Sequence, residues 1–154
     1  MRTRTILACL AVFFAGFALC FAADPNMGTW KLNEAKSKLP PGATKNNTVV
    51  FEAAGDNVKI TVDGVAGDGK PVHHEWTGKY DTKDYPVTGD PNQDTRSYKK
   101  TGDRTVEFDV KKDGKVTLTG RVVVAADGKS RTVTSTTTDS SGKKVTSTSV
   151  YDKQ

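Results

Sequence analysis

Two adjacent histidines are the residues best suited to acid–base or metal chemistry in this chain of 154 residues. His73 and His74 lie where apolar and polar side chains alternate, which predicts a strand. Because neighbouring side chains of a strand point to opposite faces, the two imidazoles cannot bind one ion together. His74 shares a face with Trp76 and Tyr80, so it could lie in a cavity and donate to a ligand or titrate near neutral pH. The alternative is a hydrogen-bonded structural histidine.

One acidic segment begins like a calcium-binding loop. Residues 90–94 carry oxygen-bearing side chains at alternate positions. The sixth position of the pattern is Thr95, where such loops need glycine, and the twelfth is Thr101, where they need a bidentate glutamate. The sequence therefore predicts a polar loop and no metal site.

Paired carboxylates also occur, as Asp81 with Asp84 and as Glu107 with Asp109. These are the residue types of a general acid and base, but their exposed alternating positions favour solvated charges. The many serines and threonines lack a Gly-x-Ser-x-Gly or Ser-x-x-Lys context that would activate one of them. We therefore predict no catalytic residue and no cofactor, and a hydrolase is the least favoured class.

The N-terminal segment has the order of a secretory signal peptide. Two arginines precede an apolar run over residues 6–23 that ends in alanines, with cleavage expected after Ala22 or Ala23. An uncleaved membrane anchor is the alternative, because the run approaches the length of a spanning helix. Cleavage is favoured because no basic stop-transfer cluster follows the run. We expect a signal peptide over 1–22, one domain over 23–154, a periplasmic or secreted location, and no stable membrane insertion after cleavage.

Cleavage would change the chemistry of the mature chain. Cys9 and Cys20 both lie in the apolar run, so the mature domain would hold neither a thiol nor a disulfide. Two of the 23 basic residues would also leave, against 18 acidic ones that stay. The remaining lysines are scattered among aspartates with no basic block, which argues against a nucleic-acid partner.

The domain itself reads as a series of β-hairpins. Asp or Ser stands beside Gly55, Gly69, Gly114, Gly128 and Gly142, a pairing typical of tight turns.

Apolar side chains alternate with polar ones between these turns, over 58–62, 72–80, 106–110 and 116–124. The only helix candidate is residues 34–39, which would start from an Asn33 cap. We predict an all-β fold of eight to ten antiparallel strands in an up-and-down barrel.

The last two predicted strands, residues 131–138 and 144–152, are dominated by serine and threonine. Their β-branched threonines favour extended backbone, but they offer few apolar side chains to bury. A barrel built with such strands should have a partly polar interior, which indicates a cavity.

Both ends of the domain resemble the calycins, the superfamily of lipocalins and fatty-acid-binding proteins. Gly28-Thr29-Trp30-Lys31-Leu32 is similar to the first strand of the fatty-acid-binding branch, and Val150-Tyr151-Asp152-Lys153 to its last strand. The resemblance implies structural roles for Trp30 and Tyr151, with Trp30 packed across the closed end of the barrel. Two features depart from the family. Ser149 stands where it places a carboxylate-binding arginine, and residues 33–48 are too few for its helical lid.

The whole mature chain resembles a group of small exported bacterial proteins of unknown function. The similar segments include Lys79-Tyr80-Asp81 and the Asp-Tyr-Pro-Val-Thr-Gly run over 84–89. This resemblance implies no known activity.

These observations favour a non-enzymatic binding protein that carries a small, partly apolar ligand in a barrel cavity. The expected ligand-binding residues are His74, Trp76, Tyr80, Phe108 and Leu118. Burial of apolar ligand surface with a few oriented polar contacts would supply the affinity.

An envelope module that binds a protein or the cell wall is the alternative function. It would use residues 81–94, the longest expected connection, with an exposed aromatic patch around Tyr85.

Overall fold

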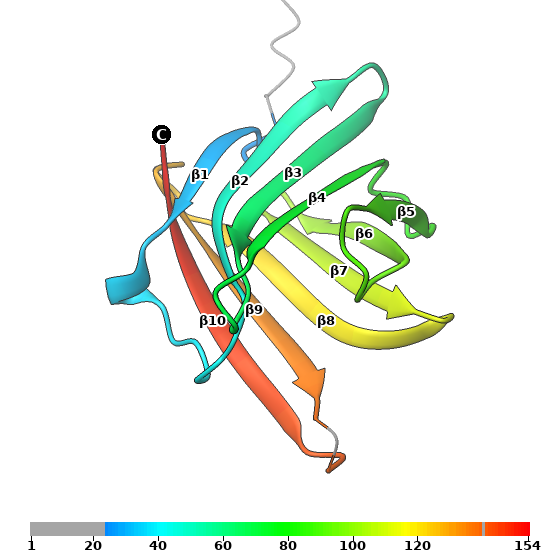
Figure 1. The fold of residues 1–154 in the computed structure, drawn as a ribbon. Helices are drawn as coiled ribbons and strands as arrows, with labels where there is room; N and C mark the ends of the chain where they lie inside the picture. The colour runs from blue at the N-terminus through cyan, green and yellow to red at the C-terminus, as the bar shows by residue number, and fades with distance from the viewer. Residues whose placement is uncertain (1–23, 140) are drawn as a thin grey trace, which may run out of the picture.

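The computed structural model describes residues 24–139 and 141–154, which form a closed barrel of ten antiparallel strands (Figure 1). The predicted signal peptide, with both cysteines, lies outside the described residues. The strands are β1 (Gly28–Leu32), β2 (Lys45–Ala54), β3 (Asn57–Val65), β4 (Pro71–Gly78), β5 (Tyr85–Thr88), β6 (Thr95–Gly102), β7 (Thr105–Lys112), β8 (Lys115–Val124), β9 (Ser130–Thr138) and β10 (Lys144–Lys153).

Each strand pairs with its neighbours in the sequence, and β1 pairs with β10 to close the ring. The predicted all-β, up-and-down barrel of eight to ten strands is confirmed.

The predicted turns also form. The glycines at the five turn signals all have positive φ, between 60° at Gly55 and 84° at Gly69. That backbone conformation costs glycine little, so these short connections set the register of successive hairpins.

Helical structure in the described residues is limited to one 3-10 turn, η1 (Glu34–Lys36). The Asn33 side chain accepts a hydrogen bond from the Lys36 amide at 3.2 Å, as the predicted cap should. The turn ends before residue 39 because Lys38 already pairs with Thr148 of β10. Over residues 24–139 and 141–154, no helix is long and apolar enough to cross a bilayer.

The segment 81–94 is not the free connection that the sequence suggested. It contains β5, which pairs with β4 through Trp76 and Val87 and fills the gap between β4 and β6 (Figure 1). Tyr85 packs edge-on against Trp76 at 5.8 Å between ring centroids, and its hydroxyl donates to Asp81 at 2.9 Å. The expected exposed aromatic patch around Tyr85 is therefore wrong, because this side chain joins the barrel wall.

A buried arginine lies at the centre of one end of the core. Trp30 is fully buried, and its indole N–H donates to the Asn26 carbonyl at 2.8 Å. The Arg131 guanidinium lies 4.7 Å from the Trp30 ring centroid, 4.6 Å from that of Phe51 and 5.1 Å from that of Tyr151. Cation–π contacts of this kind stabilise a charge that has been removed from water. The contacts join β9 to β1, β2 and β10.

Gly64 provides a test of the packing between strands. A Cβ at this position of β3 would overlap the backbone carbonyl of Lys45, next to the register shift between Lys45 and Thr48. Backbone cannot rotate away as a side chain can, so Gly64→Ala should lower the free energy of unfolding by about 1–3 kcal/mol in urea denaturation.

The matched control is Gly102→Ala, whose new Cβ would come no closer than 3.5 Å to Thr105. This change should alter stability by less than about 0.5 kcal/mol. Equal stability of the two variants would contradict the packing described for β2 and β3.

Candidate functional site

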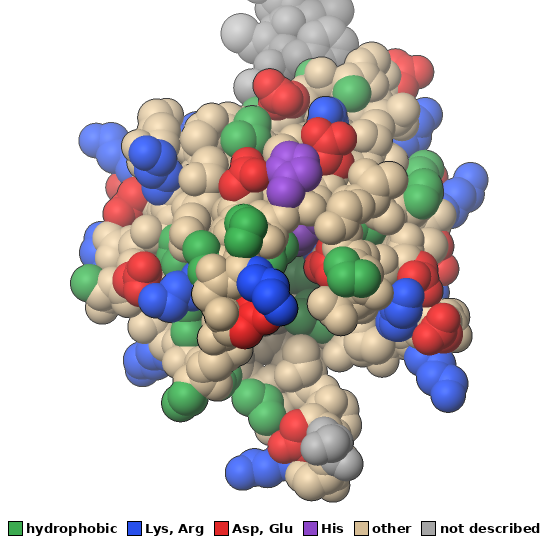
Figure 2. Space-filling view, viewed as in Figure 1, with side chains coloured by type: hydrophobic (Ala, Val, Ile, Leu, Met, Phe, Trp, Pro, Cys, Tyr) green, Lys and Arg blue, Asp and Glu red, His purple; other side chains and the backbone are tan. Residues whose placement is uncertain are grey.

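The barrel contains a cavity of about 660 Å³. Its wall takes side chains from β4 and β6 to β10, and the rest of the lining comes from residues 39–44, Asn46 of β2 and residues Asp90, Asn92 and Gln93 of the β5–β6 connection. The face of the molecule drawn in Figure 2 has a hollow, with hydrophobic side chains at its floor and charged side chains around it.

Part of the wall is apolar and part carries hydroxyl groups. The apolar part includes Phe108, Leu118 and Val133. The hydroxyl part comes from β9 and β10, whose inward residues are Ser135, Thr137, Ser147 and Ser149. Ser135 and Ser147 form a hydrogen bond at 2.8 Å across the two strands. The partly polar interior predicted from these strands is present.

Three of the five predicted ligand-binding residues line this cavity: His74, Phe108 and Leu118. They come together because each lies on the inward face of its strand, as alternation predicts. The Phe108 ring covers Gly120 of the neighbouring strand, where a larger residue would overlap it.

Trp76 and Tyr80 belong to the packed core and do not line the cavity. Trp76 is buried against Tyr98, with ring centroids 4.6 Å apart, and its indole N–H donates to the Arg96 carbonyl at 2.9 Å. Tyr80 packs on the other side of Tyr98, at 5.9 Å. Burial raises the pKa of the Tyr80 hydroxyl. Sequence alternation placed Trp76 on the inward face of β4 but not at the correct depth, and Tyr80 lies beyond Gly78, where β4 ends.

A polar cluster that the sequence analysis missed lies in the same wall. The Arg96 guanidinium donates to Gln93 Oε1 at 2.6 Å and to the Tyr98 hydroxyl at 3.3 Å, and its Nη2 lies 3.5 Å from His74 Nε2. Gln93 in turn donates to Asp90 at 2.5 Å. The sequence could have indicated Arg96, because it lies two residues before Tyr98 and strand alternation places both on one face. Gln93 comes from a connection and gave no such signal.

The environment of His74 determines its tautomer. An arginine side chain can only donate hydrogen bonds, so His74 Nε2 must be the acceptor, and Nδ1 therefore carries the proton. Nδ1 is buried without a hydrogen-bond partner in the described part of the chain, 3.9 Å from Asp90 Oδ2. Burial first, and then the charge of Arg96, lowers the pKa of His74 to about 4. His74 is therefore neutral at pH 7. The hypothesis that it titrates near neutral pH is wrong, because burial and Arg96 both disfavour its charged form.

The Asp90 carboxylate is held by its own loop. It accepts hydrogen bonds from the Asn92 amide at 2.8 Å and from the Gln93 side chain. Within residues 24–139 and 141–154, no group of three or more His, Cys, Asp or Glu side chains is placed to hold a metal ion.

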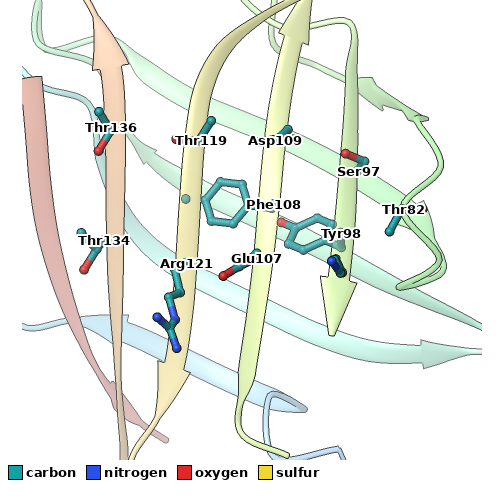
Figure 3. A pocket seen from close by; sticks show the side chains of 12 residues that line it. Thr82, Ser97, Tyr98, Glu107, Phe108, Asp109, Thr119, Arg121, Thr134 and Thr136 are labelled. Atoms are coloured by element: carbon teal, nitrogen blue, oxygen red, sulfur yellow. The ribbon is translucent and has the colours of Figure 1, made fainter. Parts of the chain in front are cut away.

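A second depression of about 610 Å³ crosses the outer face of β6 to β9 (Figure 3). Its side chains are almost all charged or hydroxyl-bearing, and Glu107 and Asp109 lie here beside Ser97 and Arg121. Of the carboxylate pair interpreted as solvated charges, Glu107 is exposed and Asp109 is half-buried. The barrel cavity is the stronger candidate site, because buried His74 lines it together with Gln93 and Arg96, none of which lines this depression.

Comparisons with known proteins support the fold and do not identify a family. No family model matches the chain, and no curated protein matches it. Among solved structures, EF1p2_mFAP2b bound to DFHBI is similar with a TM-score of 0.50 and 12% identity, over 86% of this chain and 97% of that chain. The redesigned beta barrel mFAP1 bound to DFHBI gives a TM-score of 0.44 and 19% identity, over 86% and 98%. At 12% identity the likeness to EF1p2_mFAP2b concerns the fold alone.

Acid sensitivity should reveal the buried neutral state of His74. Between pH 6.5, the ordinary pKa, and about 4, the unfolded chain binds a proton at this residue that the folded protein does not bind. The free energy of unfolding should therefore fall as the pH is lowered through this window, by up to about 3 kcal/mol from this group. Urea denaturation at several pH values measures the effect.

His74→Gln should lose this part of the pH dependence. His73→Gln is the matched control and should keep it, because His73 lies on the exposed outer face beside Asp63. A His74→Gln variant with the same loss of stability between pH 6.5 and 4 as the parent would refute the assignment.

Proposed function

We propose that this protein is a non-enzymatic binding protein that carries a small, partly apolar molecule in the barrel cavity. The observation that carries the proposal is one cavity whose lining combines an apolar wall with the polar cluster around Arg96. Small-molecule sites commonly combine a mainly apolar lining with a few fixed polar groups.

The size of the cavity supports a ligand of moderate size. Its volume of about 660 Å³ lies within the range typical of ligand pockets. Covering about 100 Å² of apolar surface at Phe108, Leu118 and Val133 would contribute roughly 2.5 kcal/mol. The hydroxyl groups of β9 and β10 can keep part of the ligand hydrated or hydrogen-bonded.

The similar barrel EF1p2_mFAP2b, whose structure is described as bound to DFHBI, offers a precedent for a small molecule bound to this architecture. Fold likeness alone is an analogy, whereas the lining of this cavity belongs to this chain and supports binding directly.

The absence of catalysis is part of the proposal. His74 has its accepting nitrogen turned to Arg96, so it is not free to act as a base toward a serine. The Ser135 and Ser147 hydroxyls are hydrogen-bonded to each other and not to a base that would activate one of them. We further propose, from the N-terminal sequence, that the protein is exported and works in the periplasm or outside the cell.

Filling the cavity should weaken binding. N-phenyl-1-naphthylamine, a neutral fluorescent probe, should bind the protein, and Leu118→Trp should weaken this binding at least about tenfold because the larger ring occupies the ligand space. Fluorescence titration measures the dissociation constant.

Val123→Trp is the matched control, since it adds the same ring to the same strand at a side chain that is 40% exposed. It should leave probe binding unchanged. No probe binding to the parent protein, or equal binding to both variants, would contradict a ligand cavity at this place.

A further inference from the structure

Arg96 has its position fixed by neutral groups only. Its three acceptors are the Gln93 amide oxygen, the Tyr98 hydroxyl and the unprotonated nitrogen of His74. No Asp or Glu of the described residues lies within ion-pair distance of the guanidinium. The side chain is therefore held in one orientation while its charge remains uncompensated.

The nearest carboxylate is separated from Arg96 by a neutral bridge. Gln93 donates to Asp90 with its amide nitrogen and accepts from Arg96 with its amide oxygen. Asp90 also accepts from the backbone amide of Asn92, which holds it in the β5–β6 connection. A direct ion pair between Asp90 and Arg96 would have been the simplest way to satisfy the arginine, and the structure does not form one.

His74 contributes a second observation. Its side chain is nine-tenths buried or more, with 3% of the residue exposed, and its Nδ1 proton has no acceptor in the part of the chain described. Because its environment keeps the imidazole neutral, it orients the guanidinium without adding a second positive charge. A cation held in this way is prepared for an anion that comes from outside the chain.

The apolar wall begins immediately beside this cation. The Arg96 guanidinium lies 5.7 Å from the Phe108 ring centroid, and Leu118 and Val110 line the same cavity. A ligand anchored at Arg96 would lay its remaining atoms against these side chains.

We propose that the ligand is an amphipathic organic acid, whose carboxylate pairs with Arg96 and whose planar or branched apolar body packs on Phe108 and Leu118. The inference rests on the proposed function, because it names the chemical class of the molecule in the same cavity. Gln93 and His74 take both Nη2 protons, so the carboxylate would accept a charge-assisted hydrogen bond from the remaining Nη1 proton, and such a bond is stronger than one to a neutral amide or alcohol. Arg96 is thus the residue that sets specificity, and His74 and Gln93 position it.

The test compares two probes that differ only in charge, 2-naphthoate and 2-naphthamide, by isothermal titration calorimetry at pH 7.5. The parent protein should bind the acid at least about tenfold more tightly than the amide. Arg96→Gln should weaken naphthoate at least about tenfold and change naphthamide by less than about threefold. Arg121→Gln removes one positive charge from the exposed outer face of β8 and should change neither.

The outcomes separate the two proposals. Equal affinity of the parent for both probes, or tight naphthoate binding that Arg96→Gln does not weaken, overturns the acid class and leaves the binding function intact. Failure of naphthoate, naphthamide and the neutral probe alike overturns both. The comparison of the two probes on the parent needs no variant, so it decides the class even if Arg96→Gln does not fold. Arg96→Lys should give an intermediate affinity for naphthoate, because the charge remains but the hydrogen bonds that fix the guanidinium are lost.

Discussion

The barrel depends on one contact at one end of its core, where the Arg131 guanidinium lies among the rings of Trp30, Phe51 and Tyr151. Arg131 is 2% exposed, and burial lowers its pKa to about 10. Removing a charge from water in this way is costly, and the three rings offset part of that cost. The contact fastens β9 to the first and last strands, so it holds the ring closed where its two ends meet.

The two interior arginines have different neighbours. Arg131 is covered by three aromatic rings, and its Nε and Nη1 atoms are buried without a hydrogen-bond partner among the described residues. Arg96 lines the cavity and donates to neutral acceptors. The neighbours of each arginine therefore determine whether it lies in the packed core or in the cavity wall. Serine and threonine on the late strands keep the cavity from filling with apolar side chains.

Strand alternation and turn glycines predicted most of this architecture from the sequence, because both are local signals. They placed His74, Phe108 and Leu118 on the cavity wall and gave the turns at five glycines. They failed where the outcome depends on distant partners. β5 has only four residues and a proline, and it is a strand because β4 and β6 leave room for it. Trp76 was predicted to be a ligand contact and lies in the core, since periodicity gives the face of a residue but not its depth. Arg96 and Arg131 were overlooked because the local sequence pattern predicts that a charged residue lies at the surface, even where it lies on an inward face.

The pairing of β1 with β10 also has a consequence for the order in which the chain can fold. Every other strand pair joins neighbours in the sequence, whereas this one brings residue 30 to residue 153. Hairpins can form and rearrange early at small entropic cost, but the last ladder closes a loop that is nearly the whole domain. Closure must therefore wait until the C-terminal strand is available, and until then the sheet is an open ribbon with two unpaired edges. A cavity, and any ligand within it, exists only after that final step.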